Sequence, residues 1–339
     1  MNRSLKSLLA VFLAIFTATI VIACQVEEEA MDDSPTEGGE LMIYSAGPGG
    51  LAEDILEGFR ESTGIDAQMF QSTTGSVLGR LEAERNNPVA DVVVLASWPA
   101  ALELLNQDLL YQYNDAENVE LLHEGWNADN YYFGYSGSAL GITYNTDRVD
   151  SPGQDWSDYA DPDWEDEVNI PDPSESGSAL DFVAGYVNTY GEQGWDLFEA
   201  LQGNEVSVAG ANREALNPVI SGAKQAVLAG VDYMGYNGRA DGEPIDVIYP
   251  DSGTVVNPRP VMILNSSENI EDAEAFVDYA LSEEVQQMVA DRLLLPGRSD
   301  IRADSDRIGY EDIPQLDLDW EWMSDNQNDI LDRFQSIFR

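Results

Sequence analysis

Residues 41–63 read LMIYSAGPGGLAEDILEGFREST, an apolar run followed by a glycine-rich turn and an amphipathic stretch. The run 41–45 is short and apolar, as in a buried strand, and the glycines and proline of 46–50 interrupt it. Apolar residues then recur at helical spacing as far as Phe59, and Gly64 ends the predicted helix. A strand, a turn and a helix in this order indicate an α/β fold.

The same order repeats further along the chain. Residues 65–71 predict a second strand, and residues 73–76 precede a helix that Pro88 ends. Residues 90–95 read ADVVVL, a nearly continuous apolar run of the kind found in parallel sheets. We therefore predict α/β architecture throughout the main part of the chain.

Two later segments predict strands that cross between two lobes. They read GITYN at 141–145 and GTVVNP at 253–258. We expect a first lobe over residues 41–140, completed by about 260–295, and a second lobe over residues 141–259. Helices within residues 296–339 are expected to pack on the second lobe.

The ordered set of segments 41–63, 84–92, 141–145, 253–258 and 296–300 carries a family resemblance. Together these segments resemble the periplasmic binding proteins that serve ferric-iron, phosphonate and sugar-phosphate ABC importers, over residues 41 to about 320. The resemblance implies two α/β lobes joined by two crossing hinge strands that close on a ligand. It also implies a binding protein, not an enzyme, that needs no cofactor. Such a protein captures a small molecule or ion as a monomer and delivers it to an ABC permease in the membrane.

The N-terminal residues predict an extracytoplasmic location. Arg3 and Lys6 precede an apolar run at 8–23, as in a signal peptide. The stretch VIAC at 21–24 resembles a bacterial lipobox, and Cys24 is the only cysteine, so it forms no internal disulfide. We predict a signal peptide over 1–23, lipidation of Cys24 and an acidic tether over 24–40, which anchor the protein at the cell surface or in the periplasm. A plain cleaved signal and a retained helix are the alternatives.

The composition is strongly acidic. The chain has 63 Asp and Glu residues against 16 Lys and Arg, a formal charge of -47. Such a chain lacks the basic patch that a nucleic-acid partner needs. Acids spread along the chain favour a solvated surface adapted to high salt, where repulsion is screened. One acidic face that binds cations is the alternative.

The residue inventory argues against catalysis. His123 is the only histidine, which excludes a histidine-rich zinc site, and no Gly-x-Ser-x-Gly motif occurs. His123 lies in a polar, acidic segment and is expected at the surface. A secreted hydrolase that uses carboxylates is kept as a distant alternative.

Polar residues at two predicted strand ends favour an anionic ligand. Backbone N–H groups at a helix N-terminus bind oxyanions, and strand ends line the crevice of an open α/β sheet. Arg259, just beyond the second crossing segment, is a candidate partner of the anion or of a buried acid. Helix capping alone is the alternative role for the hydroxyl residues. The candidates at the strand ends are Ser45, Ala46, Gly47, Thr73, Thr74, Gly75 and Ser76.

Residues 232–236 read DYMGY and separate two ligand hypotheses. Iron binders of the resembled family carry two adjacent tyrosines here, so Tyr233 and the displaced Tyr236 are metal ligands only if ferric iron is bound. Aminophosphonate binders of that family fit the segment better, with Asp232 holding a ligand ammonium group. We expect an organophosphonate or phosphate ester as the ligand, with ferric iron as the alternative.

Overall fold

The computed structural model describes residues 40–339. The predicted signal peptide, Cys24 and nearly all of the acidic tether lie outside this range and stay predictions. No helix within the described range is both long and apolar enough to cross a membrane.

The strands are β1 (Leu41–Ser45), β2 (Ala67–Gln71), β3 (Val92–Val94), β4 (Asn127–Ala128), β5 (Tyr132–Asn145), β6 (Val168–Ile170), β7 (Ser207–Val208), β8 (Ala226–Val231), β9 (Ile245–Ile248), β10 (Val256–Ile263) and β11 (Leu295–Pro296). The α-helices are α1 (Gly49–Thr63), α2 (Thr74–Ala83), α3 (Trp98–Asn106), α4 (Gly177–Tyr190), α5 (Glu192–Gly203), α6 (Asn212–Ile220), α7 (Asp232–Ala240), α8 (Ile270–Ala280), α9 (Glu283–Asp291) and α10 (Trp320–Ile337).

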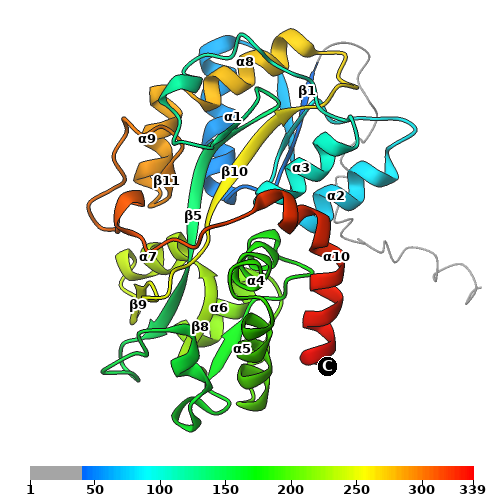
Figure 1. Ribbon diagram of the computed structural model, residues 1–339. Coiled ribbons are helices and arrows are strands. Elements are labelled where there is room, and N and C mark those ends of the chain that lie inside the picture. Colours follow the sequence, from blue (N-terminus) through cyan, green and yellow to red (C-terminus); the bar gives the residue numbers. More distant parts are fainter. Residues whose placement is uncertain (1–39) are drawn as a thin grey trace, which may run out of the picture. The chain divides into compact units, whose positions relative to one another are not determined.

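Two groups of elements surround two halves of one sheet, and we call residues 40–139 with 256–296 lobe 1 and residues 140–255 lobe 2. In lobe 1 the strand order is β2-β1-β3-β10-β5. Figure 1 labels β1, β10 and β5 of this sheet. β1 pairs in parallel with β2 and β3, as expected of strands joined through helices. β10 runs antiparallel to β3, with Val261 opposite Val94.

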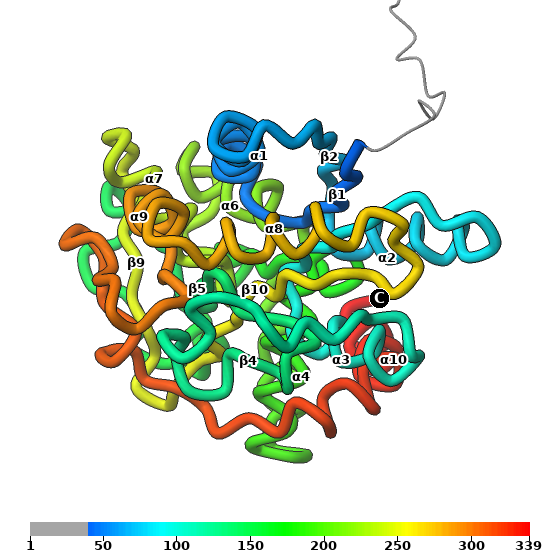
Figure 2. Tube along the Cα trace, turned by 90° about the horizontal axis from the view of Figure 1, so that it is seen from above, coloured from blue at the N-terminus to red at the C-terminus, as the bar shows by residue number. Residues whose placement is uncertain are grey.

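The two faces of the lobe 1 sheet are covered by different helices because successive strand residues point to opposite faces. Ile43 belongs to the cluster that includes Phe59 of α1, whereas Tyr44 belongs to the cluster that includes Trp98 of α3. Figure 2 shows α1 and α8 over one face and α3 with α10 on the other. α1 ends at Gly64, whose φ of 74° is left-handed, the conformation that glycine adopts without strain.

Lobe 2 continues the sheet from the second half of β5. Leu140 of β5 pairs antiparallel with Val231 of β8, and Ile142 pairs with Ile248 of β9. β6 runs parallel to β8, and β7 lies beyond β6. Helices α4 to α7 surround these strands (Figure 1).

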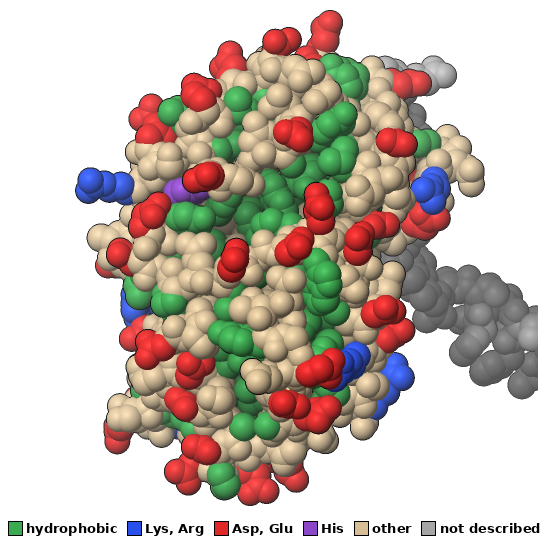
Figure 3. All heavy atoms as spheres, in the orientation of Figure 1, with side chains coloured by type: hydrophobic (Ala, Val, Ile, Leu, Met, Phe, Trp, Pro, Cys, Tyr) green, Lys and Arg blue, Asp and Glu red, His purple; other side chains and the backbone are tan. Residues whose placement is uncertain are grey.

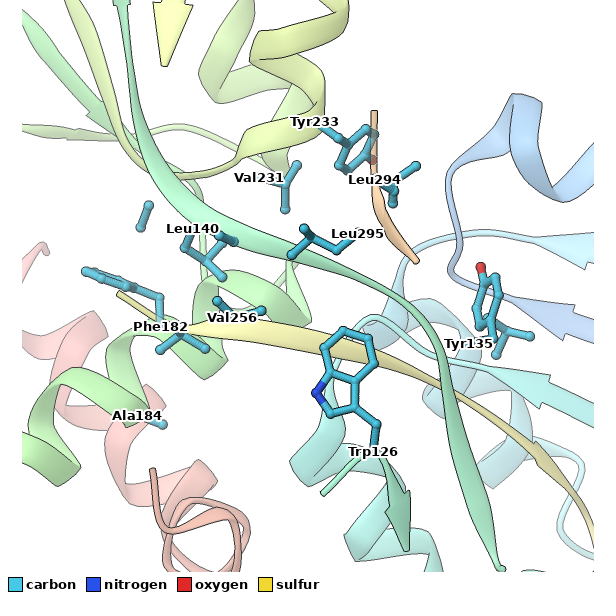
Figure 4. Close-up of a cluster of buried hydrophobic side chains, with 14 of the residues drawn as sticks. Trp126, Tyr135, Leu140, Phe182, Ala184, Val231, Tyr233, Val256, Leu294 and Leu295 are labelled. Carbon is cyan, nitrogen blue, oxygen red and sulfur yellow. The ribbon is translucent and has the colours of Figure 1, made fainter. Parts of the chain in front are cut away.

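Two strand connections join the lobes. β5 belongs to both halves of the sheet, and β10 enters lobe 1 at Val256, opposite Ala139. Figure 4 shows Leu140 of β5 beside Val256 of β10, with Phe182 of α4 next to them. These residues belong to one buried apolar cluster, so the hydrophobic core runs through the junction.

The C-terminal segment, which the sequence analysis expected to pack on the second lobe, contacts both lobes. Gly297 accepts a backbone hydrogen bond from His123 of lobe 1. Further along, α10 packs against α3 of lobe 1 as well as α4 and α5 of lobe 2. Ser324 Oγ donates to Pro99 O at 3.2 Å, and Phe334 lies edge-on to Phe198. The amphipathic pattern predicted this helix but could not show which of two adjacent lobes it meets.

Candidate functional site

A cavity of about 640 Å³ lies between the lobes. Four helices begin at this cavity, α1 and α2 from lobe 1 and α4 and α6 from lobe 2, and α7 runs beside it. A helix N-terminus presents free N–H groups and a partial positive charge. The lining residues are 46–51, 72–74, Ala96, 175–178, 211–214, Leu216, Ile220, Tyr233, Met234, Asn237, Gly238, Asp241, Glu243, Arg259, Arg292 and Leu294.

The turn after β1 supplies Ala46 and Gly47 to the cavity, as predicted from the sequence, but not Ser45. Ser45 is buried, and its Oγ accepts a hydrogen bond from Gly47 N at 3.1 Å. Its hydroxyl therefore shapes the turn and does not line the cavity. Gln71 Nε2 donates to Gly47 O at 2.9 Å, which holds this turn against the end of β2.

The start of α2 supplies Thr73 and Thr74 but neither Gly75 nor Ser76. Thr73 caps the helix, since its Oγ1 accepts a hydrogen bond from Ser76 N at 3.3 Å. Thr74 is buried, and its Oγ1 accepts from Ala96 N at 3.2 Å. Gly75 lies instead against Ser174 O of lobe 2, at a contact between the lobes. Thr73 therefore both caps α2 and lines the cavity.

The N-termini of α4 and α6 form the lobe 2 wall, which the sequence analysis did not identify. Ser176 caps α4 by accepting from Ala179 N at 3.2 Å. Asn212 Nδ2 donates to Ser176 Oγ at 2.8 Å, while the buried Asn212 Oδ1 has no partner among the described residues. The signal available in the sequence was a polar Ser-Gly-Ser run at 176–178 that precedes an apolar helical pattern.

Residues 232–236 split between the cavity and the interior of lobe 2. Tyr233 lines the cavity, and its burial raises the pKa of the phenol, an effect that the nearby Arg259 and Arg213 oppose. Tyr236 faces away and donates to Tyr249 Oη at 3.1 Å. The two tyrosines of the iron hypothesis are therefore not brought together.

Asp232 is fully buried and does not line the cavity. Its Oδ2 lies 2.7 Å from Arg307 Nη2, in an ion pair whose side chains are both inaccessible to solvent. Tyr249 Oη also donates to Asp232 Oδ2 at 2.7 Å. The carboxylate is thus occupied by protein partners, which corrects the expectation that it meets a ligand ammonium group.

Arg259 is the charged residue that points most clearly to a ligand. It lies on β10, lines the cavity and is only 3% exposed. Its Nε and Nη1 have no hydrogen-bond partner among residues 40–339, and its guanidinium sits 5.2 Å from the ring centroid of Tyr233. Ser136 stands opposite Arg259 on β5, and its buried hydroxyl also lacks a partner in this part of the chain. A buried cation without an acceptor is costly, so the arrangement favours an anion in the cavity.

The remaining candidate for catalysis lies elsewhere. His123 does not line the cavity; its ring stacks on Tyr310 with centroids 4.1 Å apart. Burial lowers the pKa of the imidazole, so the expected surface position is only partly correct. Among the described residues, no group of three His, Cys, Asp or Glu side chains is arranged to hold a metal ion.

Comparison with known proteins gives the same architecture with several ligands. Residues 87–326 match the family model described as bacterial extracellular solute-binding protein. The periplasmic binding protein AfuA from Actinobacillus pleuropneumoniae, solved with fructose-6-phosphate, superposes with a TM-score of 0.82 at 22% identity, covering 88% of this chain and 98% of that one. The likeness confirms the predicted two-lobe α/β fold.

Two curated relatives have names that point to different ligands. Iron uptake protein A1 of Synechocystis sp. is 27% identical over 311 residues, covering 82% of this chain and 83% of the relative. A putative 2-aminoethylphosphonate-binding periplasmic protein of Salmonella typhimurium is 22% identical over 254 residues, covering 73% and 74%. The relatives therefore leave iron, phosphonate and phosphate esters as ligand classes.

Proposed function

Because this chain belongs to the bacterial extracellular solute-binding protein family, we propose that its cavity captures an organophosphonate or a phosphate ester. The chain is the extracytoplasmic solute-binding component of an ABC importer, a binding protein and not an enzyme. It therefore binds a small ligand and delivers it to a membrane permease.

The observation that carries this proposal is the guanidinium of Arg259 on the cavity wall, whose Nε and Nη1 have no hydrogen-bond partner within residues 40–339. A phosphonate or phosphate group offers several acceptor oxygens, and planar guanidinium groups bind such oxygens in pairs. The N–H groups at the starts of α1, α2, α4 and α6 add neutral donors around the same anion. Very few basic side chains are needed, which suits a chain this acidic.

The positions of these donors link binding to closure. α1 and α2 belong to lobe 1, whereas α4 and α6 belong to lobe 2. An anion that contacts both pairs of helices stabilises the closed arrangement about β5 and β10. Ligand release to the permease then requires the lobes to separate, as in hinge-closing proteins generally.

Ferric iron is the second candidate, supported by Tyr233 in the cavity and by the iron uptake relative. Phenolate oxygen is a hard ligand that suits Fe(III). However, Tyr236 is turned away toward Tyr249, and Arg259 places positive charge where a cation would sit. The phosphonate or phosphate ester is therefore preferred.

A thermal-shift panel tests the proposal. The probes are methylphosphonate, 2-aminoethylphosphonate, fructose-6-phosphate, inorganic phosphate and ferric citrate, in 2 M KCl. A phosphonate or phosphate ester at 100 times its Kd is expected to stabilise the folded protein by about 2.7 kcal/mol. Arg259→Met should abolish that shift, whereas Arg85→Met, an exposed arginine away from the cavity, should retain it.

The iron hypothesis has its own outcome in the same panel. A visible charge-transfer band with ferric citrate that disappears in Tyr233→Phe would replace the phosphonate proposal by iron binding. A shift of equal size in wild type and Arg259→Met would also reject the proposed anion site.

A further inference from the structure

A second buried acidic group joins the two lobes without itself lining the cavity. Asp181 lies in α4 of lobe 2 and is fully buried. Its Oδ1 accepts a hydrogen bond from Ser97 Oγ of lobe 1 at 2.8 Å. Ser97 also caps α3, because its Oγ accepts from Ala100 N at 3.2 Å. A carboxyl group of lobe 2 is thus bonded to the N-terminal end of a lobe 1 helix.

The second oxygen of Asp181 shows which protonation state fits this site. Asp181 Oδ2 is buried and has no partner among residues 40–339. The Asn257 side chain of β10 lies within hydrogen-bonding reach of the carboxyl. Asn257 Nδ2 donates to Ala96 O at 2.8 Å, and Asn257 Oδ1 lacks a donor in the described chain. Asp181 Oδ2 and Asn257 Oδ1 are thus two acceptors without a donor. A neutral Asp181 carboxyl carries one O–H, which can donate to the amide oxygen and satisfy both.

Within the described part of the chain, no ion-pair partner compensates an ionised Asp181. The groups that act on it are Ser97, Asn257 and the backbone of Trp98, none of them ionised. Burial raises the pKa of the Asp181 carboxyl to about 8, and hydrogen bonding, first of all from Ser97, opposes that rise without cancelling it. α10 packs on both α3 and α4, and its buried residues Met323, Ser324, Ile330 and Phe334 are not titratable.

We propose that Asp181 is a proton-dependent latch: the lobes close with a neutral Asp181 and separate more readily once its carboxyl ionises. Opening moves Ser97 away from Asp181, because the two residues belong to different lobes, and lets water reach the carboxyl. The open form then has the ordinary pKa of an aspartate, near 3.8, and the closed form the raised one.

The direction of the effect follows from proton linkage. Between the ordinary pKa and about 8 the closed form holds one proton more than the open form. Closure is therefore weakened as the pH rises through this window, by up to about tenfold per pH unit, and is insensitive to pH above it. At neutral pH the latch is only partly engaged, so modest pH differences change the closing equilibrium.

The test measures lobe separation without any ligand, so that it fails or succeeds independently of the proposed function. Spin labels at Glu57→Cys on α1 and Glu199→Cys on α5, in a Cys24→Ser background, report the distance between lobes by pulsed electron paramagnetic resonance. From pH 6 to pH 8 the open-to-closed ratio of the otherwise wild-type chain should rise about tenfold or more. In Asp181→Asn, whose amide mimics the neutral acid, the ratio should stay constant.

Two further variants separate a latch from a general acid effect. Asp163→Asn removes an exposed carboxyl of lobe 2 and should respond to pH as the wild type does. Ser97→Ala removes a hydrogen bond that lowers the Asp181 pKa, so the pH response should extend to higher pH. An Asp181→Asn chain that opens with pH as the wild type does, or a wild type without any pH response, overturns the proposal.

Discussion

Arg259 is expected to favour binding of an anionic ligand but to lower the free energy of unfolding of the protein without ligand. Its Nε and Nη1 are buried without partners among the described residues. Arg259→Met removes this charge while keeping much of the side-chain volume. We expect the free energy of unfolding without ligand to rise by about 1–4 kcal/mol, the range seen when buried ion pairs are replaced by apolar side chains. Urea unfolding of the two proteins measures it.

The matched control for that measurement is Arg307→Met. Arg307 is an equally buried arginine, but it pairs with Asp232. Removing it leaves the carboxylate uncompensated and should lower the free energy of unfolding by about 3–5 kcal/mol. A lower free energy of unfolding in both variants would contradict the proposal that Arg259 is a ligand-binding residue without a partner in the protein.

For residues 232–236, the sequence did not reveal which side chains reach the cavity and which pair with distant residues. The segment was recognised as important, yet only Tyr233 reaches the cavity. Asp232 is taken by Arg307, which is 75 positions away along the chain. No local pattern indicates such a partner, because a buried ion pair depends on which distant segment the fold brings near. Arg259 was identified because it follows a predicted crossing strand.

At the scale of elements, strands and helices of lobe 1 were predictable and the lobe 2 wall was not. The strand at 41–45 and the helix that ends at Gly64 match the structure, since apolar spacing and glycine punctuation determine them locally. The first crossing strand begins at Tyr132, whereas the sequence analysis placed it at 141–145. The glycines and serines of its first half hide the apolar pattern of a strand, so that half was not predicted. The starts of α4 and α6 meet the cavity only through tertiary packing.

Gly177, at the start of α4, is predicted to control how closely the lobes approach. A Cβ at this position would lie 3.0 Å from Thr74 Oγ1 and 3.1 Å from Ser97 Cβ, both in lobe 1. Gly177→Ala should therefore act as a wedge. Overpacking of about 1–3 kcal/mol corresponds to a shift of about 5–150-fold toward the open form. The spin-label pair on α1 and α5 should report a longer mean distance.

Gly79→Ala in α2 is the control for the wedge. A Cβ there meets no heavy atom within 4 Å, so the variant gains only helix propensity, about 0.5–1 kcal/mol. Its lobe distance should equal that of the wild type. If Gly177→Ala behaves like Gly79→Ala, neighbouring side chains absorb the added methyl and the contact does not limit closure.

For the whole molecule, charge is the dominant feature. The chain carries a formal charge of -47, and Figure 3 shows acidic side chains scattered over the visible face of both lobes with few basic ones among them. Like-charged neighbours cost about 0.2–0.5 kcal/mol each. We expect the free energy of unfolding to rise by more than about 2 kcal/mol between 0.1 M and 2 M KCl, as measured by urea unfolding.

The shape of that salt dependence identifies its cause. Because the Debye length falls to about 3 Å at 1 M salt, most of the rise should be complete by then. Potassium chloride is the salt to use, since sulfate also strengthens apolar burial. Stability that is independent of chloride concentration would show that the acidic surface imposes little repulsion on the folded state.

The central strand of the lobe 1 sheet also determines the order of events after synthesis. β3 meets β10 through the pair Val94 and Val261, so the edge of β3 stays unpaired until the ribosome has reached residue 261 of 339. At about 5–20 residues per second the delay between these partners is roughly 10–30 seconds. Neither lobe 1 nor its half of the cavity can form during that interval. The complete lobe 1 sheet therefore assembles only after all of lobe 2 has been synthesised.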